Sequence, residues 1–558
     1  MKVLILGGYG TFGGRLAELL SDEARVTLII AGRSVAAAEN FIAKLGGSAK
    51  AIPQFFDRDG DVGAQLAAIK PDVVADATGP FQVYGNKPYR LVDAAIAQRV
   101  NYLDLADGSE FVAGITQFDE RAKAANVFVL SGVSSFPVLT AAVLNELEKN
   151  MSRLDSLRGG IAPSPFAGVG LNVIRAIASY TGKPLQVIRD GSWQAAYGLT
   201  ETMRYTIAPP GKLPLLNIHF SLVDVPDLRA LPQLRPQLRS VWMGAGPVPV
   251  ILHRMLNMLA WLVRSKVLPS ALPFARIMDK VINALRWGED RGGMFVEAEG
   301  LDKEGRPAKI CWHLLAEKKD GPMIPSMACE AIIRTALDNH FPISGARSGA
   351  GALSLADYEK LFAPRSISTG IRRESEGDVT QPIFRQILGS AWDQLPDSLR
   401  ALHGVKGKTA FAGKADIERG KSIGARIVCA LFGFPREGKD VRVRVAFNAS
   451  SEQEIWERTF GDRTFRSHLK AGRGRSKHLL SERFGRIEAG IALVVEGEKL
   501  NWLVRRWSMF GVPMPHRLAP SGLSYEHDDK GRFHFHVEIK LPLAGLVVRY
   551  RGWLIPEQ

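Results

Sequence analysis

Cysteine is scarce in this chain, and its few cysteines show no ligand spacing. The 558 residues include only Cys311, Cys329 and Cys429. Such scatter excludes a disulfide framework and a Cys-x-x-Cys zinc site, and it favours a reducing compartment. The N-terminus begins directly with an apolar strand and lacks the layout of a secretory signal. We therefore expect a cytoplasmic protein without a metal site.

Apolar runs long enough to cross a bilayer are also missing. The most apolar stretch, residues 250–268, contains no uncharged run approaching the roughly 20 residues that a spanning helix needs. Three interpretations stay open for this helix: a dimer or domain interface, a peripheral membrane contact flanked by Arg264 and Lys266, and ordinary core. Its more polar side chains share helical spacing and predict one narrow polar stripe: Arg254, Asn257, Trp261 and Arg264.

Acidic residues are too few to balance the basic ones. The formal net charge is +15, and residues 371–558 hold 32 Lys and Arg against 22 Asp and Glu, a surplus of 10. A basic surface attracts nucleic acid, acidic membranes or anionic ligands without discriminating among them. Since no helix-turn-helix, zinc finger or RNA-stacking motif accompanies the surplus, we expect no nucleic-acid partner.

Glycine, by contrast, is concentrated in a turn near the N-terminus, at residues 7–14. An apolar strand over residues 2–6 leads into a turn that opens a helix, with the order Gly7, Gly8, Tyr9, Gly10, Thr11, Phe12 and Gly13. Gly8, Gly10 and Gly13 fit the G-x-G-x-x-G spacing of a dinucleotide-binding turn, in which bare main-chain N–H groups meet the pyrophosphate. The sequence therefore predicts a nicotinamide cofactor here.

The end of the second predicted strand indicates which cofactor. An NAD site usually has Asp or Glu at this position, but the sequence offers Gly32, Arg33 and Ser34. A guanidinium and a hydroxyl suit a 2′-phosphate, which predicts NADP, with NAD as the alternative.

Two further strand ends supply candidate cofactor contacts. The fourth strand runs into Thr78, Gly79, Pro80 and Phe81, which we expect to line the nicotinamide ribose. Asp57 follows the third strand, where it either meets the adenine amine or caps a helix.

Candidate catalytic side chains lie after the fifth strand. Asp104 and Asp107 are the best polar candidates for binding a substrate amine or handling a proton, and Tyr84 is a weaker one. Ordinary loop capping is the alternative for either aspartate. No Ser, His and Asp set indicates a hydrolase.

Changes in residue pattern along the chain predict its domains. The first part alternates strand and helix, as a doubly wound parallel sheet does. Two hairpin signals, one with an Asp-Gly turn at residues 190–191, predict an α+β domain with an antiparallel sheet. Period-two alternation near the end predicts a mainly antiparallel β domain. The expected boundaries are 1–145, 146–343, a linker at 344–380, and 381–558.

Taken together, these motifs resemble those of the saccharopine dehydrogenase-like oxidoreductases over about residues 1–345. The residues that carry the likeness are the Gly7 to Gly14 turn, Ala31-Gly32-Arg33-Ser34, Ala77-Thr78-Gly79-Pro80-Phe81, Tyr84-Gly85, residues 102–107, residues 132–137 and residues 321–325. The resemblance implies an NAD(P)-binding first domain and a second domain that closes over substrate and often mediates dimers. It leaves the substrate open.

The end of the chain resembles a separate domain of unknown function that is often fused to such proteins. That likeness is carried by residues 391–396, 482–485 and 550–554. We expect an NADP-dependent oxidoreductase, a homodimer, acting on a small carbonyl, imine or secondary-amine substrate. The alternative is a non-catalytic dinucleotide-binding protein that docks to membrane or carries a lipid through its apolar helix and basic C-terminal domain.

Overall fold

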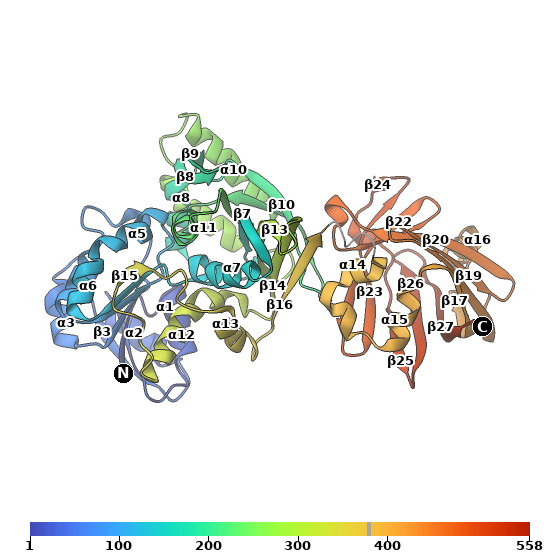
Figure 1. Cartoon of the computed structure of the whole chain (residues 1–558), viewed down its shortest axis with the longest axis horizontal. Helices are drawn as coiled ribbons and strands as arrows, with labels where there is room; N and C mark the ends of the chain where they lie inside the picture. The colour runs from blue at the N-terminus through green and yellow to red at the C-terminus, as the bar shows by residue number, and fades with distance from the viewer. Residues whose placement is uncertain (169, 376–380, 558) are drawn as a thin grey trace. The chain divides into compact units, whose positions relative to one another are not determined.

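The computed structural model describes residues 1–168, 170–375 and 381–557, which divide into two compact units (Figure 1). Unit 1 comprises Met1–Tyr205 and Ile218–Ser368, and unit 2 comprises Thr206–Asn217 and Thr369–Gln558. Apart from residues 206–217, the first two predicted domains therefore belong to one unit. Strands β10 (Thr202–Ile207), β11 (Leu215–Leu222) and β16 (Ile367–Ser375) contain the points where the chain passes between the units.

A doubly wound parallel sheet begins unit 1, as the sequence predicts. Its strands are β1 Lys2–Leu6, β2 Thr27–Gly32, β3 Lys50–Phe55, β4 Val73–Asp76, β5 Asn101–Asp104, β6 Phe128–Ser131 and β15 Gly345–Ser348, in the order β15-β6-β5-β4-β1-β2-β3. The chain order reverses at β1, which lies between β4 and β2. Ligands of such sheets bind at the carboxyl ends of the strands on either side of this switch point.

Helices connect these parallel strands. They are α1 Thr11–Leu19, α2 Val35–Ile42, α3 Val62–Ile69, α4 Arg90–Ala97, α5 Ser109–Gly114, α6 Asp119–Ala125 and α7 Thr140–Glu148, with short turns η1 Phe81–Val83, η2 Ile115–Phe118 and η3 Ser135–Leu139. The strands read as near-continuous apolar runs because helices cover both faces of the sheet. Leu4, Ile5 and Leu103, for example, are fully buried.

The second part of unit 1 is built on a mixed sheet. Its inner strands run in the order β11-β12-β7-β13-β14, with β7 Met151–Ala162, β12 Ser240–Ala245, β13 Gly292–Asp302 and β14 Pro307–Ala316. The hairpin β13–β14 is confirmed, as is a separate hairpin of β8 Pro184–Arg189 and β9 Ser192–Tyr197. The expectation of an antiparallel sheet is wrong for β7 and β12, which pair in parallel. About eighty residues separate these strands, which is ample for the crossover that parallel pairing needs.

Further helices complete unit 1. They are α8 Leu171–Tyr180, α9 Asp227–Leu234, α10 Val250–Arg264, α11 Ala275–Ala284, α12 Ile324–Leu337 and α13 Leu355–Phe362. Helix α12 packs back on helix α1 beside the first sheet. Its Ser326 Oγ donates to the Phe12 carbonyl at 3.0 Å, and Arg334 Nη2 donates to the Leu19 carbonyl at 2.8 Å.

The predicted linker at 344–380 contains regular structure. Strand β15 pairs in parallel with β6, helix α13 has a capping box at Ser354, and β16 begins at Ile367; residues 376–380 lie outside the described residues. Its Gly, Ser and Ala content suggested a linker, but a four-residue edge strand needs little apolar sequence. In β15 only Gly345 and Ala346 are buried.

Unit 2 is a closed antiparallel barrel. Ten strands pair in the order β22-β21-β20-β19-β18-β17-β27-β26-β25-β23, and β22 pairs with β23 to close the ring. They are β17 Gly407–Arg419, β18 Gly438–Ala449, β19 Glu454–Phe460, β20 Arg463–Ala471, β21 Leu480–Phe484, β22 Ile487–Glu496, β23 Lys499–Met509, β25 Ser524–Asp529, β26 Arg532–Leu541 and β27 Gly545–Pro556; a short β24, Val512–Pro513, extends β23. Helices α14 Ile383–Leu388, α15 Asp397–His403 and α16 Ile423–Leu431 complete the unit.

Candidate functional site

The glycine turn lies at the switch point of the parallel sheet. Gly7 has φ +70°, and a Cβ there would lie 3.0 Å from the Ala77 carbonyl oxygen at the end of β4. A Cβ on Gly13 would lie 2.4 Å from the Gly7 oxygen, so only glycine allows helix α1 to approach the turn this closely. The turn is thus held against both β4 and its own helix, as a dinucleotide-binding turn requires.

The start of α1 is open to an anion. Among the described residues no side chain caps this helix, whose N-cap is the exposed Gly10. Thr11 and Phe12 are partly exposed beside it. The second part of unit 1 reaches this place too, because Arg15 Nη2 donates to the Ala167 carbonyl at 2.8 Å. An uncapped helix start with bare N–H groups fits a diphosphate.

A side chain at the end of β2 would have to displace Tyr9. A Cβ on Gly32 would lie 2.4 Å from the hydroxyl oxygen of Tyr9, whose ring covers this position. The same hydroxyl accepts a hydrogen bond from the Ser34 backbone N–H at 3.2 Å. Arg33 is exposed and makes no ion pair with any described residue. Ser34 Oγ caps α2 by accepting from the Ala37 N–H, which leaves its own O–H free to donate.

Phe55 is a candidate contact that sequence reasoning missed. It ends β3 directly beside Gly32 in the parallel register, and its side chain is half exposed. An exposed aromatic ring at the carboxyl edge of the sheet offers a surface on which a base can stack. Its position after an apolar strand could have signalled this. Asp57, by contrast, accepts from the Asp59 N–H at 3.1 Å and so stabilises its own turn.

A chain of hydrogen bonds follows β4. Thr78 Oγ1 donates to Asp76 Oδ1 at 2.5 Å and lies 2.8 Å from the Tyr84 hydroxyl. Burial raises the pKa of Asp76 above its ordinary range, although Arg58 lies 3.8 Å away and opposes the shift. The Arg58 guanidinium also stacks on the Tyr84 ring. Sequence reasoning found Thr78 and Tyr84 but missed Asp76 and Arg58, although Asp76 ends a parallel strand.

Phe81 shapes the wall behind this loop. Its ring is buried and packs against Tyr84 and Phe111, with ring centres 4.7 and 5.1 Å apart. Gly79 and Pro80, by contrast, are partly exposed. The loop therefore presents Thr78, Gly79 and Pro80 beside the glycine turn, while Phe81 anchors it.

Asp104 is enclosed at the end of β5. Its Oδ1 accepts from Ser131 Oγ, Gly132 N and Ala106 N at 3.0, 2.7 and 3.0 Å. Its Oδ2 has no hydrogen-bond partner among the described residues. Burial raises the pKa of Asp104 to about 7. Asp104 thus joins β5 to β6 and holds a proton near neutral pH, but it does not reach the crevice surface.

Asp107 belongs to an acidic cluster that the sequence did not reveal. It is partly exposed and accepts from Gln82 Nε2 at 3.0 Å, and burial raises its pKa to about 6, with the charge of Asp224 adding to the shift. Asp224 follows β11 and accepts from Ser109, and its own pKa is raised by burial. The pKa of Tyr180, at the end of α8, is raised by burial and by the charges of both carboxylates. Two carboxylates and a phenol therefore lie in one region beyond the carboxyl end of β5, close enough to influence one another's pKa.

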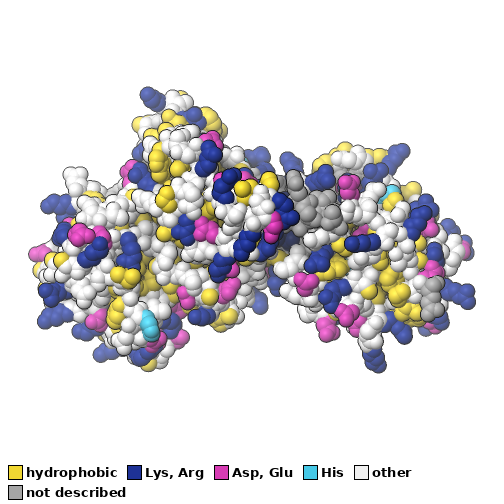
Figure 2. All heavy atoms as spheres, viewed as in Figure 1, with side chains coloured by type: hydrophobic (Ala, Val, Ile, Leu, Met, Phe, Trp, Pro, Cys, Tyr) yellow, Lys and Arg dark blue, Asp and Glu magenta, His cyan; other side chains and the backbone are white. Residues whose placement is uncertain are grey.

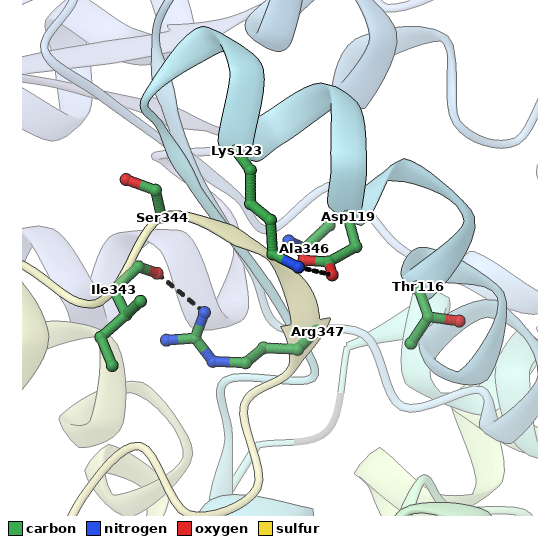
Figure 3. Close-up of a pocket in the computed structure, with 7 residues that line it drawn as sticks. All are labelled: Thr116, Asp119, Lys123, Ile343, Ser344, Ala346 and Arg347. Atoms are coloured by element: carbon green, nitrogen blue, oxygen red, sulfur yellow. Dashed lines mark hydrogen bonds and ion pairs between the residues drawn. The ribbon is translucent and has the colours of Figure 1, made fainter.

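Two other candidates for a site among the described residues are a metal-binding group and the hollow beside α6 and β15. Within the described residues no group of three or more His, Cys, Asp or Glu could hold a metal ion. The hollow in Figure 3 lies beside α6 and β15, away from the glycine turn. Lys123 there is paired with Asp119 at 2.6 Å, and Arg347 donates to the Ile343 carbonyl at 2.8 Å.

Comparison with known families agrees with the geometry at the glycine turn. Residues 3–130 match the family model of the saccharopine dehydrogenase NADP binding domain. Residues 395–554 match the model of a domain of unknown function, DUF4166. Both likenesses inferred from the motifs are thereby confirmed, the first over residues 3–130 of the 345 expected. The chain carries a nicotinamide dinucleotide-binding domain of the dehydrogenase type, fused to a second family domain.

Solved structures share the arrangement only distantly. Saccharopine dehydrogenase (L-Glu forming) from Saccharomyces cerevisiae is 13% identical, with 67% of this chain and 100% of that chain covered and a TM-score of 0.46. A probable dehydrogenase from Thermotoga maritima is 12% identical, with 66% and 98% covered and a TM-score of 0.32. Biliverdin reductase from Synechocystis, solved with biliverdin and NADP+, is 12% identical, with 61% and 92% covered and a TM-score of 0.28. At these TM-scores the likeness says nothing of the reaction. No curated protein matches the sequence.

Proposed function

We propose that this protein is an NADP-dependent oxidoreductase that transfers hydride to or from a small carbonyl, imine or secondary-amine substrate. The observation that carries the proposal is the uncapped start of α1, held against β4 by Gly7 and Gly13. The match of residues 3–130 to an NADP binding domain supports it.

Each part of the cofactor has residues that suit it. The N–H groups at the start of α1 would bind the diphosphate, and Arg33 with Ser34 would bind a 2′-phosphate. Phe55 offers a stacking surface for the adenine, and Thr78 to Pro80 would line the nicotinamide side. When bound, the cofactor supplies or accepts the hydride.

The acidic cluster favours a nitrogen-bearing substrate. Asp107 and Asp224 would attract an ammonium or iminium group, because a cation between two carboxylates relieves their mutual repulsion. With its pKa at about 6, Asp107 can hold or release a proton close to neutral pH. Among the three substrate classes, the imine or secondary amine therefore suits these residues best.

Nucleotide titration tests the NADP assignment. The intact protein should bind NADPH more tightly than NADH, and Arg33→Ala should weaken NADPH binding about tenfold or more with NADH unchanged, since a charge-assisted hydrogen bond contributes about 1.5–3 kcal/mol. Lys44→Ala, an exposed cation in the turn after helix α2, is the matched control. Equal affinity of the wild type for both nucleotides would remove the NADP assignment.

Turnover separates the enzyme from a non-catalytic binding protein. NADPH oxidation should be measured by absorbance against a panel of imino acids and keto acids, and NADP+ reduction against secondary amines. We expect turnover with an imine or amine. Tight nucleotide binding with no turnover across the panel would favour the non-catalytic alternative.

A further inference from the structure

Helix α10 leaves an apolar face uncovered in unit 1. Four large side chains recur every three or four residues and are 50–61% exposed: Ile251, Met255, Met258 and Trp261. Residues at this spacing share one helix face. The opposite face, with His253, Ala260 and Val263, is buried. The four exposed side chains are called the α10 stripe below.

The structure corrects the polar stripe expected on this helix. Asn257 points inward, where its Nδ2 donates to the Leu199 carbonyl and to Ser221 Oγ, both at 2.8 Å. Trp261 and Arg264 are exposed, and the Arg264 guanidinium stacks on the Trp261 ring. The helix therefore holds its polar amide inside the protein and shows its apolar side chains outside.

Helix α11 enlarges the apolar surface. Its Ile277 is 61% exposed, and the flanking Phe274, Leu285 and Trp287 are exposed as well. The buried faces of both helices meet in one cluster, where Val263 of α10 and Ala275 of α11 pack with Ile174 of α8. The exposed apolar side chains of α10 and α11 therefore belong to one part of unit 1.

Unpaired positive charge surrounds these apolar side chains. Residues 250–287 contain six Lys and Arg and a single acidic residue, Asp279. All six are exposed, and none lies within ion-pair distance of an acidic group of the described residues: Arg254, Arg264, Lys266, Arg276, Lys280 and Arg286. Figure 2 shows yellow hydrophobic side chains beside dark blue Lys and Arg over the region that carries α10 in Figure 1.

We propose that the α10 stripe and its neighbours on α11 dock unit 1 on the surface of an acidic phospholipid bilayer. Apolar side chains beside a basic rim suit the boundary between acyl chains and anionic headgroups, and Trp261 has the amphipathic ring that such boundaries favour. No helix in the described part of the chain is long and apolar enough to cross a membrane. At 15 residues, α10 is about 22 Å long and would lie in the plane of the membrane.

Charge argues against a second copy of the chain as the occupant. A two-fold dimer through this face would bring two sets of six unpaired cations together, and like charges at an interface repel. An acidic bilayer would instead neutralise them. The docking surface is independent of the glycine turn and goes beyond the proposed oxidoreductase function.

Vesicle flotation with the full chain tests the proposal. Phosphatidylcholine vesicles with phosphatidylglycerol should bind the protein at least tenfold more tightly than vesicles of phosphatidylcholine alone. Met255→Glu with Met258→Glu should abolish binding, and Ile343→Glu, an exposed apolar residue outside the patch, should not. Arg254→Glu with Lys266→Glu should weaken binding at least tenfold, whereas Lys303→Glu should have no effect.

Three results would overturn the proposal. One is wild-type protein that binds acidic vesicles no more tightly than vesicles of phosphatidylcholine alone. A second is binding that the Met255→Glu and Met258→Glu pair leaves unchanged, although circular dichroism shows that the variant is folded. A third is a dimer in sedimentation velocity that the same pair dissociates, because a second copy would then cover the stripe.

Discussion

At the scale of single residues, the three acids near the crevice differ in what their oxygens contact. Asp76 and Asp104 are fully buried, and Asp104 Oδ1 is surrounded by three donors. Asp107 is partly exposed and has one donor, Gln82. A group that exchanges protons with a substrate must reach it, so Asp107 is the catalytic candidate, whereas Asp104 only joins the ends of β5 and β6.

Asp104 should make the protein less stable as the pH rises. Its folded pKa, about 7, lies above the ordinary value of 3.8, so the folded state keeps a proton that the unfolded state has lost. Below pH 3.8 Asp104 does not change the free energy of unfolding. Between pH 3.8 and pH 7 its ionisation in the unfolded state lowers the free energy of unfolding by about 4 kcal/mol, and above pH 7 this loss stays constant. Asp104→Asn mimics the neutral acid, so its free energy of unfolding should fall less between pH 5 and pH 8. Denaturant titrations showing equal falls for variant and wild type would contradict this.

Asp107→Asn should abolish turnover without weakening NADPH binding. An amide cannot exchange a proton, and losing a general acid or base lowers kcat about 100-fold or more. If Asp107 acts as the acid in reduction, kcat/KM of the wild type should fall as the pH rises through about 6, and this dependence should vanish in the variant. Asp104→Asn is the control that keeps its turnover. An Asp107→Asn variant with wild-type kcat and the same pH profile would exclude the assignment.

Residues close together in sequence were the predictable part of the site. The glycine turn, Arg33 and Thr78 each follow a strand and could be found from one short motif. Asp224 and Tyr180 could not, because β11 and α8 bring them to Asp107 from over seventy residues away. The covering of Gly32 by Tyr9 was equally hidden, since both belong to recognised motifs but nothing in sequence shows that they touch.

At the scale of elements, hydrophobic pattern predicted individual strands better than their pairing. Six of the seven strands of the first sheet, all but β15, and the hairpins fall close to where alternation and turn residues place them. Period-two alternation indicates which face of a strand is buried, but it does not indicate which strands pair. The pairing of β22 with β23, which closes the barrel, could therefore not be predicted. The parallel pairing of β12 with β7 was missed for the same reason.

At the scale of the whole molecule, unit 2 includes a short segment that interrupts the sequence of unit 1. Residues 206–217 separate the two sequence segments of unit 1 but belong to unit 2. There Leu213 and Leu216 pack against Leu479 and Val494, and the Val495 N–H donates to the Gly211 carbonyl at 2.9 Å. The family match at residues 395–554 thus marks only part of unit 2.

A fragment ending at residue 375 should therefore be less soluble than the full chain. Removing the barrel leaves Leu213 and Leu216 without the side chains that bury them. Light scattering should show aggregation of the fragment, and Leu213→Ser with Leu216→Ser should reduce it. A monodisperse fragment with both leucines intact would contradict this, because it would show that Leu213 and Leu216 can be exposed without causing aggregation.

The binding of NADPH to the glycine turn is the central claim, and calorimetry of the full chain tests it most directly. The wild type should bind one NADPH per chain. Gly13→Ala should lower the affinity at least about 100-fold, equivalent to about 2.7 kcal/mol, because its Cβ cannot fit beside the Gly7 oxygen. Gly63→Ala, in helix α3 where a Cβ has room, should bind like the wild type. Absence of NADPH binding by the wild type, or unchanged affinity in a folded Gly13→Ala variant, would contradict the account.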